Sequence, residues 1–305
     1  MRPRIVVVAG PTASGKTALA VELAERLGGE IIGADSVQIY RDFDIGSAKP
    51  TAKELRGVRH ALIDAIDPRE PIDAMIYARM ADEAIAETAS RGKVPIVTGG
   101  TGLWLRALLR GLVDLPEPDP GIRARLMRQI DERGAPALHA ELAKIDPIAA
   151  ADIHENDAFR IVRALEVFEQ TGKPVGEIRR EHALGAPRYD AYFFVLDHDL
   201  DELTPRIEAR LEAMFAAGWV DEVKRLREIY GEAVRAFGSV GYKELLAHVR
   251  GEIDLDEAKR LIRKATRIYA RRQRTWFRNE KGVRARGRAE ALLEGRELLD
   301  FLEGR

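Results

Sequence analysis

Residues 10–17 place two glycines, a lysine and a threonine at the G-x-x-x-x-G-K-T spacing of a phosphate-binding loop. The glycines let backbone N–H groups turn toward an anion, and the start of the following helix adds a partial positive charge. The lysine would bind phosphate oxygens, and the threonine hydroxyl would bind Mg²⁺. The predicted diphosphate- or nucleotide-binding residues are Gly10, Pro11, Thr12, Ala13, Ser14, Gly15, Lys16 and Thr17, with Thr17 as the metal-binding residue.

This motif predicts a site for a diphosphate or a triphosphate without saying which. Two phosphates with Mg²⁺ would fill the same loop whatever organic group they carry, so kinase, nucleotide hydrolase and diphosphate-using transferase are all open. The later strand candidate at 93–98 (KVPIVT) lacks the terminal aspartate of a usual Walker B motif. That absence disfavours an ordinary nucleotide hydrolase.

Polar residues also follow two other predicted strands, at Asp35–Gln38 and at Gly99–Gly102. In an open parallel sheet the carboxyl ends of the strands face the ligand, so both segments are candidates for the same site. Asp35 could coordinate Mg²⁺ through water, cap a turn, or act as a general base. Thr101 could contact a substrate or serve only as a turn residue among glycines.

Short apolar runs that are rich in β-branched residues alternate with helical patterns in the first hundred residues. Strands are predicted at 4–9, 30–34, 60–66, 93–98 and 189–196. Helices are predicted at 18–27, 76–90, 203–217, 220–230, 242–250 and 256–279. This alternation predicts a P-loop NTPase-like parallel α/β sheet that is flanked by helices.

The pattern changes at 115–120 (LPEPDP), where three prolines in six residues mark a boundary. Helices are then predicted at 121–133, 135–145 and 157–171, before the strand at 189–196. We therefore predict an all-helical insert domain at 113–188. The α/β core would be formed by 1–112 and 189–283, and a polar tail would occupy 284–305.

The composition of the 305 residues, 46% hydrophobic and 32% charged, is ordinary for a soluble globular protein. The absence of cysteine excludes disulfides, thiolate zinc sites and cysteine nucleophiles. The apolar run at 5–9 is too short for a signal peptide, and no 18-residue apolar run occurs. We expect a cytoplasmic protein without a membrane partner, and a monomer.

Positive charge is concentrated near the carboxyl end of the chain. Residues 259–288 hold thirteen Lys or Arg and one acid, Glu280, so this segment carries +12 while the formal net charge of the chain is −1. Five arginines are predicted to share one helix face, namely Arg263, Arg267, Arg271, Arg274 and Arg278. The face could bind nucleic acid or be merely solvated. Ile262, Ala265, Tyr269 and Trp276 are predicted to form an apolar stripe that anchors the helix to the core. For Tyr269 and Trp276 the alternative is stacking on a base.

The histidines give no sign of a metal site. His60 and His154 have no cluster of other ligands around them, so ordinary polar or capping roles are predicted.

Six segments resemble one family, the tRNA dimethylallyltransferases, also called tRNA isopentenyltransferases. They are GPTASGKT from Gly10, GADSVQIYRDFDIGSAKP from Gly33, GGTGLWLRALLRGL from Gly99, HENDAFRIVRALEVFEQTGKP from His154, GSVGYKE from Gly238 and RIYARRQRTWF from Arg267. The first segment is shared by many P-loop proteins, whereas the second and third are highly specific. The resemblance covers residues 5 to about 280.

The resemblance implies a fold similar to P-loop kinases, with a helical insert that grips the anticodon stem-loop. It also implies transfer of the dimethylallyl group of dimethylallyl diphosphate to the exocyclic N6 amine of the adenine 3′-adjacent to the anticodon, with Mg²⁺ as cofactor and tRNA as partner. Lys16 and Mg²⁺ would stabilise charge on the departing diphosphate. Asp35 would take the amine proton as general base.

The same resemblance implies further roles residue by residue. Thr101 would act beside Lys16 and Asp35 as a catalytic residue that contacts the substrate. The implied tRNA-binding residues are Asp35, Ser36, Val37, Gln38, Thr101, Arg123, Phe159, Arg160, Ile161, Val162, Arg163, Gly238, Ser239, Val240, Gly241, Tyr242 and Lys243.

Two other functions compete with this one. A P-loop nucleotide or small-molecule kinase would use the arginine-bearing insert as a lid. A P-loop RNA-binding protein would bind RNA without forming a product.

Overall fold

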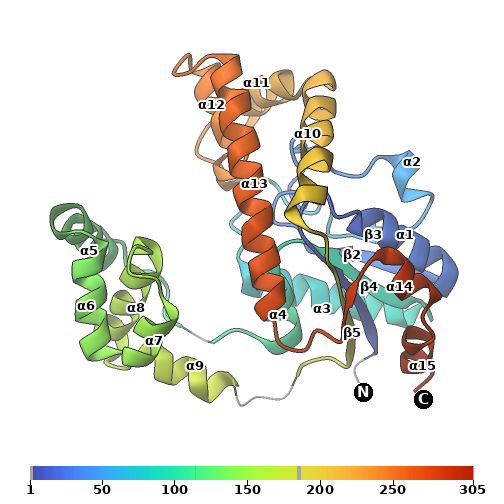
Figure 1. The fold of residues 1–305 in the computed structure, drawn as a ribbon, viewed down its shortest axis with the longest axis horizontal. Coiled ribbons are helices and arrows are strands. Elements are labelled where there is room, and N and C mark those ends of the chain that lie inside the picture. Colours follow the sequence, from blue (N-terminus) through green and yellow to red (C-terminus); the bar gives the residue numbers. More distant parts are fainter. Residues whose placement is uncertain (1–2, 114, 184–186, 305) are drawn as a thin grey trace. The chain divides into compact units, whose positions relative to one another are not determined.

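The computed structural model describes residues 3–113, 115–183 and 187–304. Their contacts divide the chain into two compact units (Figure 1). The first unit is formed by Met1–Leu109 with Arg188–Arg305, and the second is formed by Arg110–Pro187. The first holds an α/β fold, and the second is helical.

The first unit is built on a parallel sheet with the strand order β3-β2-β4-β1-β5-β6. Its strands are β1 (Ile5–Ala9), β2 (Gly29–Gly33), β3 (His60–Ala61), β4 (Val94–Gly99), β5 (Ala191–Leu196) and β6 (Ala285–Gly287). Strand β4 pairs with β1 on one side and with β2 on the other, so the crossover from β1 to β2 spans one strand. The predicted parallel α/β fold is confirmed.

Alongside the sheet, the first unit contains α-helices. They are α1 (Lys16–Leu27), α2 (Ala52–Leu55), α3 (Ala74–Ser90), α4 (Gly102–Arg110), α10 (Leu200–Ala216), α11 (Trp219–Tyr230), α12 (Tyr242–Val249), α13 (Leu255–Asn279), α14 (Ala289–Glu294) and α15 (Glu297–Glu303). Strand β1 is buried at all five positions, which explains why its sequence is continuously apolar rather than alternating. The 25-residue helix α13 packs along α10 and α12 (Figure 1).

The strand predicted at 60–66 is wrong beyond its first two residues. Leu62 and Asp64 have positive φ angles of 61° and 53°, which a continuous strand does not allow. Pairing therefore stops after Ala61, and only an isolated bridge between Tyr40 and Ile66 extends it. The apolar pattern of this run gave no sign that two of its residues adopt a left-handed backbone conformation and turn the chain.

The segment predicted as a polar tail, 284–305, is a structural part of the first unit. Strand β6 pairs with β5, and Leu292, Leu298 and Phe301 are buried in the same core cluster as Val6 and Val8. The surrounding charged residues concealed these apolar positions in the sequence.

The second unit has its own core. Its helices are α5 (Pro120–Arg133), α6 (Ala135–Ile145), α7 (Pro147–Asp152), α8 (Ala158–Thr171) and α9 (Val175–Ala183). Leu138, Leu142, Ile161 and Val167 are fully buried at its centre. Asp119 and Asp157 cap the first turns of α5 and α8, so the helix starts predicted near these residues are confirmed.

Helices α4, α7 and α9 do not follow from the sequence analysis, because they are short and lie beside glycine or proline. Within the part of the chain that the structure describes, no helix combines the length and the apolarity that crossing a membrane requires.

Two adjacent leucines of α15 test the structural role of the carboxyl-terminal segment. Leu298 is 3% exposed and Leu299 is 47% exposed. We expect Leu298→Ala to lower the free energy of unfolding by about 2–4 kcal/mol, because it leaves a cavity in the core. The matched change Leu299→Ala should cost less than about 0.5 kcal/mol. Urea denaturation measures both, and equal losses would contradict the described packing.

Candidate active site

The phosphate-binding loop joins β1 to α1, as its sequence pattern predicts. Gly15 has a φ of 86° and precedes the first helical residue, Lys16, without any side-chain cap on the helix. The amide groups at the start of α1 are thus left for an anion to bind. A Cβ atom on Gly10 would lie 2.9 Å from Ser14 Oγ and 3.1 Å from Leu196, so only glycine fits the close approach there.

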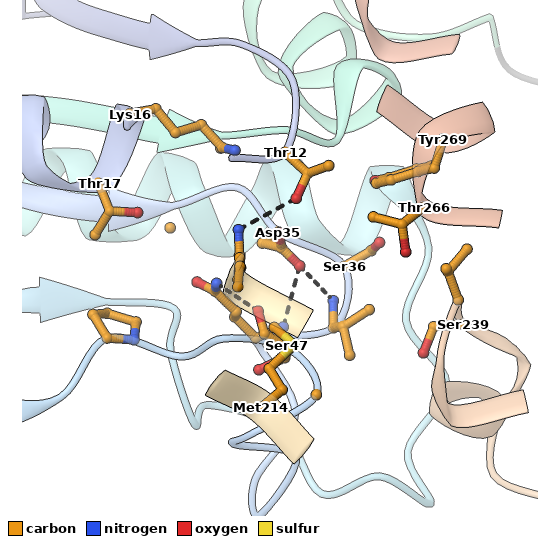
Figure 2. Close-up of a pocket in the computed structure, with 18 of the residues that line it drawn as sticks. Thr12, Lys16, Thr17, Asp35, Ser36, Ser47, Met214, Ser239, Thr266 and Tyr269 are labelled. Carbon is orange, nitrogen blue, oxygen red and sulfur yellow. Dashed lines mark hydrogen bonds between the residues drawn. The ribbon is translucent and has the colours of Figure 1, made fainter. Parts of the chain in front are cut away.

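The loop opens into a cavity of about 340 Å³. Thr12, Lys16 and Thr17 line it from the loop, and Asp35 to Gln38 line it from the end of β2 (Figure 2). The predicted phosphate-binding and carboxylate-bearing segments therefore share one site. A second part of the wall is apolar, with Ile63, Ile207, Leu211, Met214, Trp219 and Val240.

Lys16 lies in an electropositive environment. Its Nζ donates a hydrogen bond of 3.1 Å to the carbonyl oxygen of Pro11. Burial and the charge of Arg210 lower the pKa of Lys16 to about 8, against the opposing effect of Asp35. The ammonium thus faces the cavity with little compensating charge, which favours binding of an anion.

Arg210 on α10 is a site residue that the sequence analysis missed. Its Nη1 donates to Thr12 Oγ1 at 3.3 Å, and it lines the cavity with Lys16. Burial lowers the pKa of this guanidinium, while Asp35 and Glu54 act in the opposite direction. No described carboxylate forms an ion pair with it. Its helix contains many charged residues, so nothing in the local sequence singles it out.

Asp35 has one of its predicted roles, that of a turn cap. Its Oδ1 accepts hydrogen bonds from the backbone N–H groups of Val37 at 2.9 Å and Gln38 at 3.3 Å, so it caps the turn that follows β2. No residue in the described ranges donates to its Oδ2. The turn therefore orients the carboxylate and leaves one oxygen available to the cavity.

Thr101 does not line the cavity. Its Oγ1 accepts a hydrogen bond of 3.1 Å from the backbone N–H of Ser36, and its own N–H donates to the carbonyl oxygen of Ala34. Thr98 and Gly99 of the neighbouring strand line the cavity instead. Thr101 thus supports the segment that carries Asp35 rather than facing the site directly.

Helix α13 is tied to the phosphate-binding loop. Gln273 is buried, its Oε1 accepts from Thr12 N–H at 2.8 Å, and its Nε2 donates to the carbonyl oxygen of Gly100 at 2.9 Å. Tyr269 also reaches the site: it is 37% exposed and lines the cavity, so its predicted core role is wrong. Trp276 packs against Gly102 and stacks on Arg106, which fits its predicted anchoring role.

The arginines of α13 do not act as one free face. Arg263 pairs with Glu208 and Glu212, Arg267 approaches Glu208, and Arg274 pairs with Asp199. These three therefore join α13 to α10 and the loop before it. Among the described residues, the exposed basic side chains of α13 without an ion pair are Lys264, Arg271, Arg272 and Arg278.

The second unit divides its predicted tRNA-binding residues between surface and core. Phe159 is 69% exposed with the Arg123 guanidinium 5.6 Å from its ring centre, and Arg160 is also exposed. Ile161 and Val162 are buried in the core of this unit, so their side chains cannot contact RNA. That prediction was too broad because a helix exposes only one face.

Arg123 and Arg163 share a buried partner. Both donate to Glu166 Oε2, at 2.9 Å and 2.8 Å, and Glu166 is fully buried. Burial raises the pKa of Glu166, but the hydrogen bonds from Arg163 and Arg123 outweigh it and lower the pKa below its ordinary value. Both arginines therefore stabilise the second unit, whatever else they bind.

The segment 238–243 also has some residues at the cavity or the surface and others in the core. Gly238, Ser239 and Val240 line the cavity, and Lys243 is exposed. Tyr242 is fully buried, and a Cβ on Gly241 would lie 2.1 Å from Trp219, so both belong to the packing behind the cavity.

The predicted ordinary roles of the histidines fit their contacts. His60 Nδ1 lies 3.1 Å from the carbonyl oxygen of Val58, and burial lowers its pKa. His154 Nδ1 accepts from the N–H of Asn156. Among the described residues, no three His, Cys, Asp or Glu side chains are grouped so as to hold a metal ion.

Comparison with known proteins finds one family. Residues 38–280 match the family described as IPP transferase. The chain is 53% identical over 280 residues to the tRNA dimethylallyltransferase of Anaeromyxobacter sp. (strain K), covering 92% of each protein, and 48% identical over 277 residues to that of Sorangium cellulosum, covering 90% of this chain and 88% of the relative.

Two solved structures are similar over the whole chain. The full-length tRNA isopentenylpyrophosphate transferase of Bacillus halodurans is 35% identical, with a TM-score of 0.73 and coverage of 100% of this chain and 98% of that one. A eukaryotic dimethylallyltransferase acting on tRNA is 27% identical, with a TM-score of 0.78 and coverage of 99% and 80%.

The lowered pKa of Lys16 makes anion binding depend on pH. Inorganic sulfate keeps its charge as pH rises, but Lys16 loses its proton on passing through about 8. Between one unit below and one unit above that value, sulfate affinity should fall by about tenfold, because only the protonated amine attracts the anion. Calorimetric titration at several pH values measures this.

Two variants control the experiment. Lys16→Met should bind sulfate weakly with little pH dependence. Arg210→Met should shift the fall in affinity to higher pH, because Arg210 lowers the pKa of Lys16. An unchanged pH profile in Lys16→Met would rule out Lys16 as the titrating group.

Proposed function

This chain belongs to the IPP transferase family, and we propose that its cavity transfers a dimethylallyl group from dimethylallyl diphosphate to the N6 amine of the adenine 3′-adjacent to the anticodon in tRNA. Diphosphate is the leaving group. The observation that carries the proposal is the composition of one cavity, where two cations, a carboxylate and an apolar wall meet. Each part suits one part of this reaction.

The cationic end suits the diphosphate. Lys16 donates to Pro11 and Arg210 donates to Thr12 on the loop, and both line the cavity. Among the described residues, neither forms an ion pair with a carboxylate. Negative charge builds on the diphosphate as its bond to the allylic carbon breaks. Two fixed cations and the start of α1 stabilise that charge more in the transition state than in the bound substrate.

Asp35 suits the proton transfer. The adenine amine is a weak nucleophile, and its nitrogen becomes acidic as the new C–N bond forms. A carboxylate held by the turn at Val37 and Gln38 accepts this proton with its second oxygen. The base must leave its stack to reach the cavity, which is inexpensive in a single-stranded loop.

The apolar wall suits the five-carbon chain. Ile207, Leu211 and Met214 line the cavity from α10 together with Arg210, so an apolar group attached to a diphosphate at Arg210 would lie against them. The wall also keeps water away from the allylic carbon, which would otherwise compete with the amine.

The residues present fit Mg²⁺. Thr17 carries a hydroxyl beside the phosphate-binding loop, and Mg²⁺ usually takes few protein ligands together with substrate phosphates and water. Thr17 would hold the ion against the diphosphate, with Asp35 in reach through water. When bound, the ion would place positive charge beside the departing diphosphate and stabilise its negative charge.

A kinase reading is not favoured. The relatives are named for dimethylallyl transfer, and β4 ends in Thr98-Gly99 without a Walker B aspartate. Phosphoryl transfer would also leave the apolar wall without a role.

RNA binding by the first unit is proposed for the open face of α13. Lys264, Arg271 and Arg272 are exposed and without an ion pair among described residues, and Tyr269 on the same helix lines the cavity. In the second unit, exposed Phe159 suits stacking on a base or ribose.

The reaction is tested with purified protein, Mg²⁺, labelled dimethylallyl diphosphate and tRNA. We expect label on the adenine 3′ to the anticodon. Asp35→Asn should slow transfer by about 10²–10⁴-fold while tRNA affinity stays close to that of the wild type, because only the proton acceptor is lost. Asp201→Asn, on the exposed first turn of α10, is the matched control. Absence of label with folded wild-type protein refutes the proposal.

Arginines of α13 provide a matched test of the RNA surface. The double variant Arg271→Ala/Arg272→Ala should weaken tRNA binding and reduce the slope of log affinity against log salt by about one per lost phosphate contact. Arg263→Ala/Arg267→Ala removes the same charge from the side paired with Glu208 and Glu212, and should leave that slope unchanged. Equal slopes in both double variants would contradict this assignment.

A further inference from the structure

The stretch DIGSAKP from Asp44, part of the highly specific segment that begins at Gly33, surrounds a buried carboxylate that the proposed reaction does not use. Glu222 on α11 is 4% exposed. Its Oε2 accepts from the N–H groups of Asp44 at 3.0 Å and Ile45 at 2.7 Å, and its Oε1 accepts from Gly46 N–H at 3.1 Å. Tyr242 also donates its hydroxyl to Oε1, at 2.6 Å. Four donors thus converge on one side chain.

Packing fixes the same segment from a second direction. A Cβ atom on Gly46 would lie 2.0 Å from Trp219 Nε1 and 2.6 Å from Tyr242 Cζ. Gly46 and Ser47 also line the cavity, and Figure 2 shows Ser47 there. The segment Asp44–Ala48, which we call the anchored loop, is therefore held between α11, α12 and the site.

The anchored loop determines how Gln38 is oriented. Gln38 Nε2 donates to the carbonyl oxygens of Ser47 at 3.0 Å and Ala48 at 3.1 Å. Two carbonyl acceptors at one end of the amide identify that end as the nitrogen and use both of its hydrogens. The other end is Oε1, to which no described residue donates. Gln38 can then offer the cavity an acceptor but no donor.

We propose that Glu222 is a positioning residue that fixes the amide of Gln38 through the anchored loop, so that the cavity presents a hydrogen-bond acceptor beside Asp35 and selects a base with an amino group. The inference rests on the proposed function. Adenine carries an amine at C6, whose hydrogens suit both Asp35 and Gln38 Oε1. Guanine and hypoxanthine carry a carbonyl oxygen there, which would face Gln38 Oε1 with like polarity.

A carboxylate is required at position 222 because every group around it donates. An amide nitrogen in place of either oxygen would face at least one backbone N–H group, which would lose its acceptor. Glu222→Gln therefore keeps the size of the side chain while releasing the anchored loop. Tyr242→Phe removes one of the four donors and leaves the loop contacts in place, so it is the matched mild variant.

A double-mutant cycle on transfer to a synthetic anticodon stem-loop tests the proposal. Glu222→Gln and Gln38→Ala should each lower kcat/KM for RNA by about tenfold, and the double variant should be no worse than either alone. KM for dimethylallyl diphosphate should stay within about twofold, since the cationic end is untouched. Additive losses, about a hundredfold in the double variant, would overturn the proposal.

Base discrimination gives a readout that a purely structural role would not change. Wild-type protein should bind a stem-loop with adenine at the target position about tenfold more tightly than one with hypoxanthine, and both single variants should lose this preference. Equal loss of affinity for the two RNAs would overturn the proposal. Thermal unfolding checks each variant. If Glu222→Gln does not fold, Gly46→Ala displaces the same loop from Trp219.

The proposed function and the role of Glu222 fail in different experiments. A folded wild-type protein that transfers nothing to RNA contradicts the proposed function. An active wild type with additive variants and unaltered base preference contradicts the role of Glu222 alone.

Discussion

The arrangement of the site depends on two positive charges, Lys16 and Arg210, that both lie near one carboxylate, Asp35. Lys16 and Arg210 face the same cavity. Burial lowers the pKa of each, and the charge of Arg210 lowers the pKa of Lys16 further. Buried charges without close partners destabilise a folded protein, so such an arrangement persists where a ligand supplies the missing charge. Under the proposed function, the diphosphate would supply this charge.

Several polar side chains near the cavity stabilise the loops that form its wall. Gln273 ties the phosphate-binding loop to Gly100, Thr101 holds Ser36, and Glu222 holds the anchored loop. Each forms hydrogen bonds with backbone groups of loops around the cavity. Rigid catalytic geometry on loops requires such side chains, because loop backbone otherwise pairs with water.

Arginine has two distinct uses in this chain. In the second unit, Arg123 and Arg163 neutralise buried Glu166, and on α13 Arg263 and Arg274 join neighbouring elements. Also on α13, Arg271 and Arg272 are exposed and form no ion pair with any residue that the structure describes. Positive charge along a helix therefore indicates nucleic-acid binding only after the acidic partners from other elements are known, and these come from distant parts of the sequence.

The sequence by itself determined the parallel α/β fold, the phosphate-binding loop and the position of Asp35, because each depends on local pattern: a buried strand, a glycine-lysine turn, a polar strand end. Tertiary structure decided what depends on distant segments. In the folded chain Arg210 contacts the phosphate-binding loop, and Thr101 binds the backbone of Ser36. Ile161, Val162 and Leu298 are buried in the two cores. No local pattern encodes these, because a side chain's burial and partners are set by whichever elements pack against it.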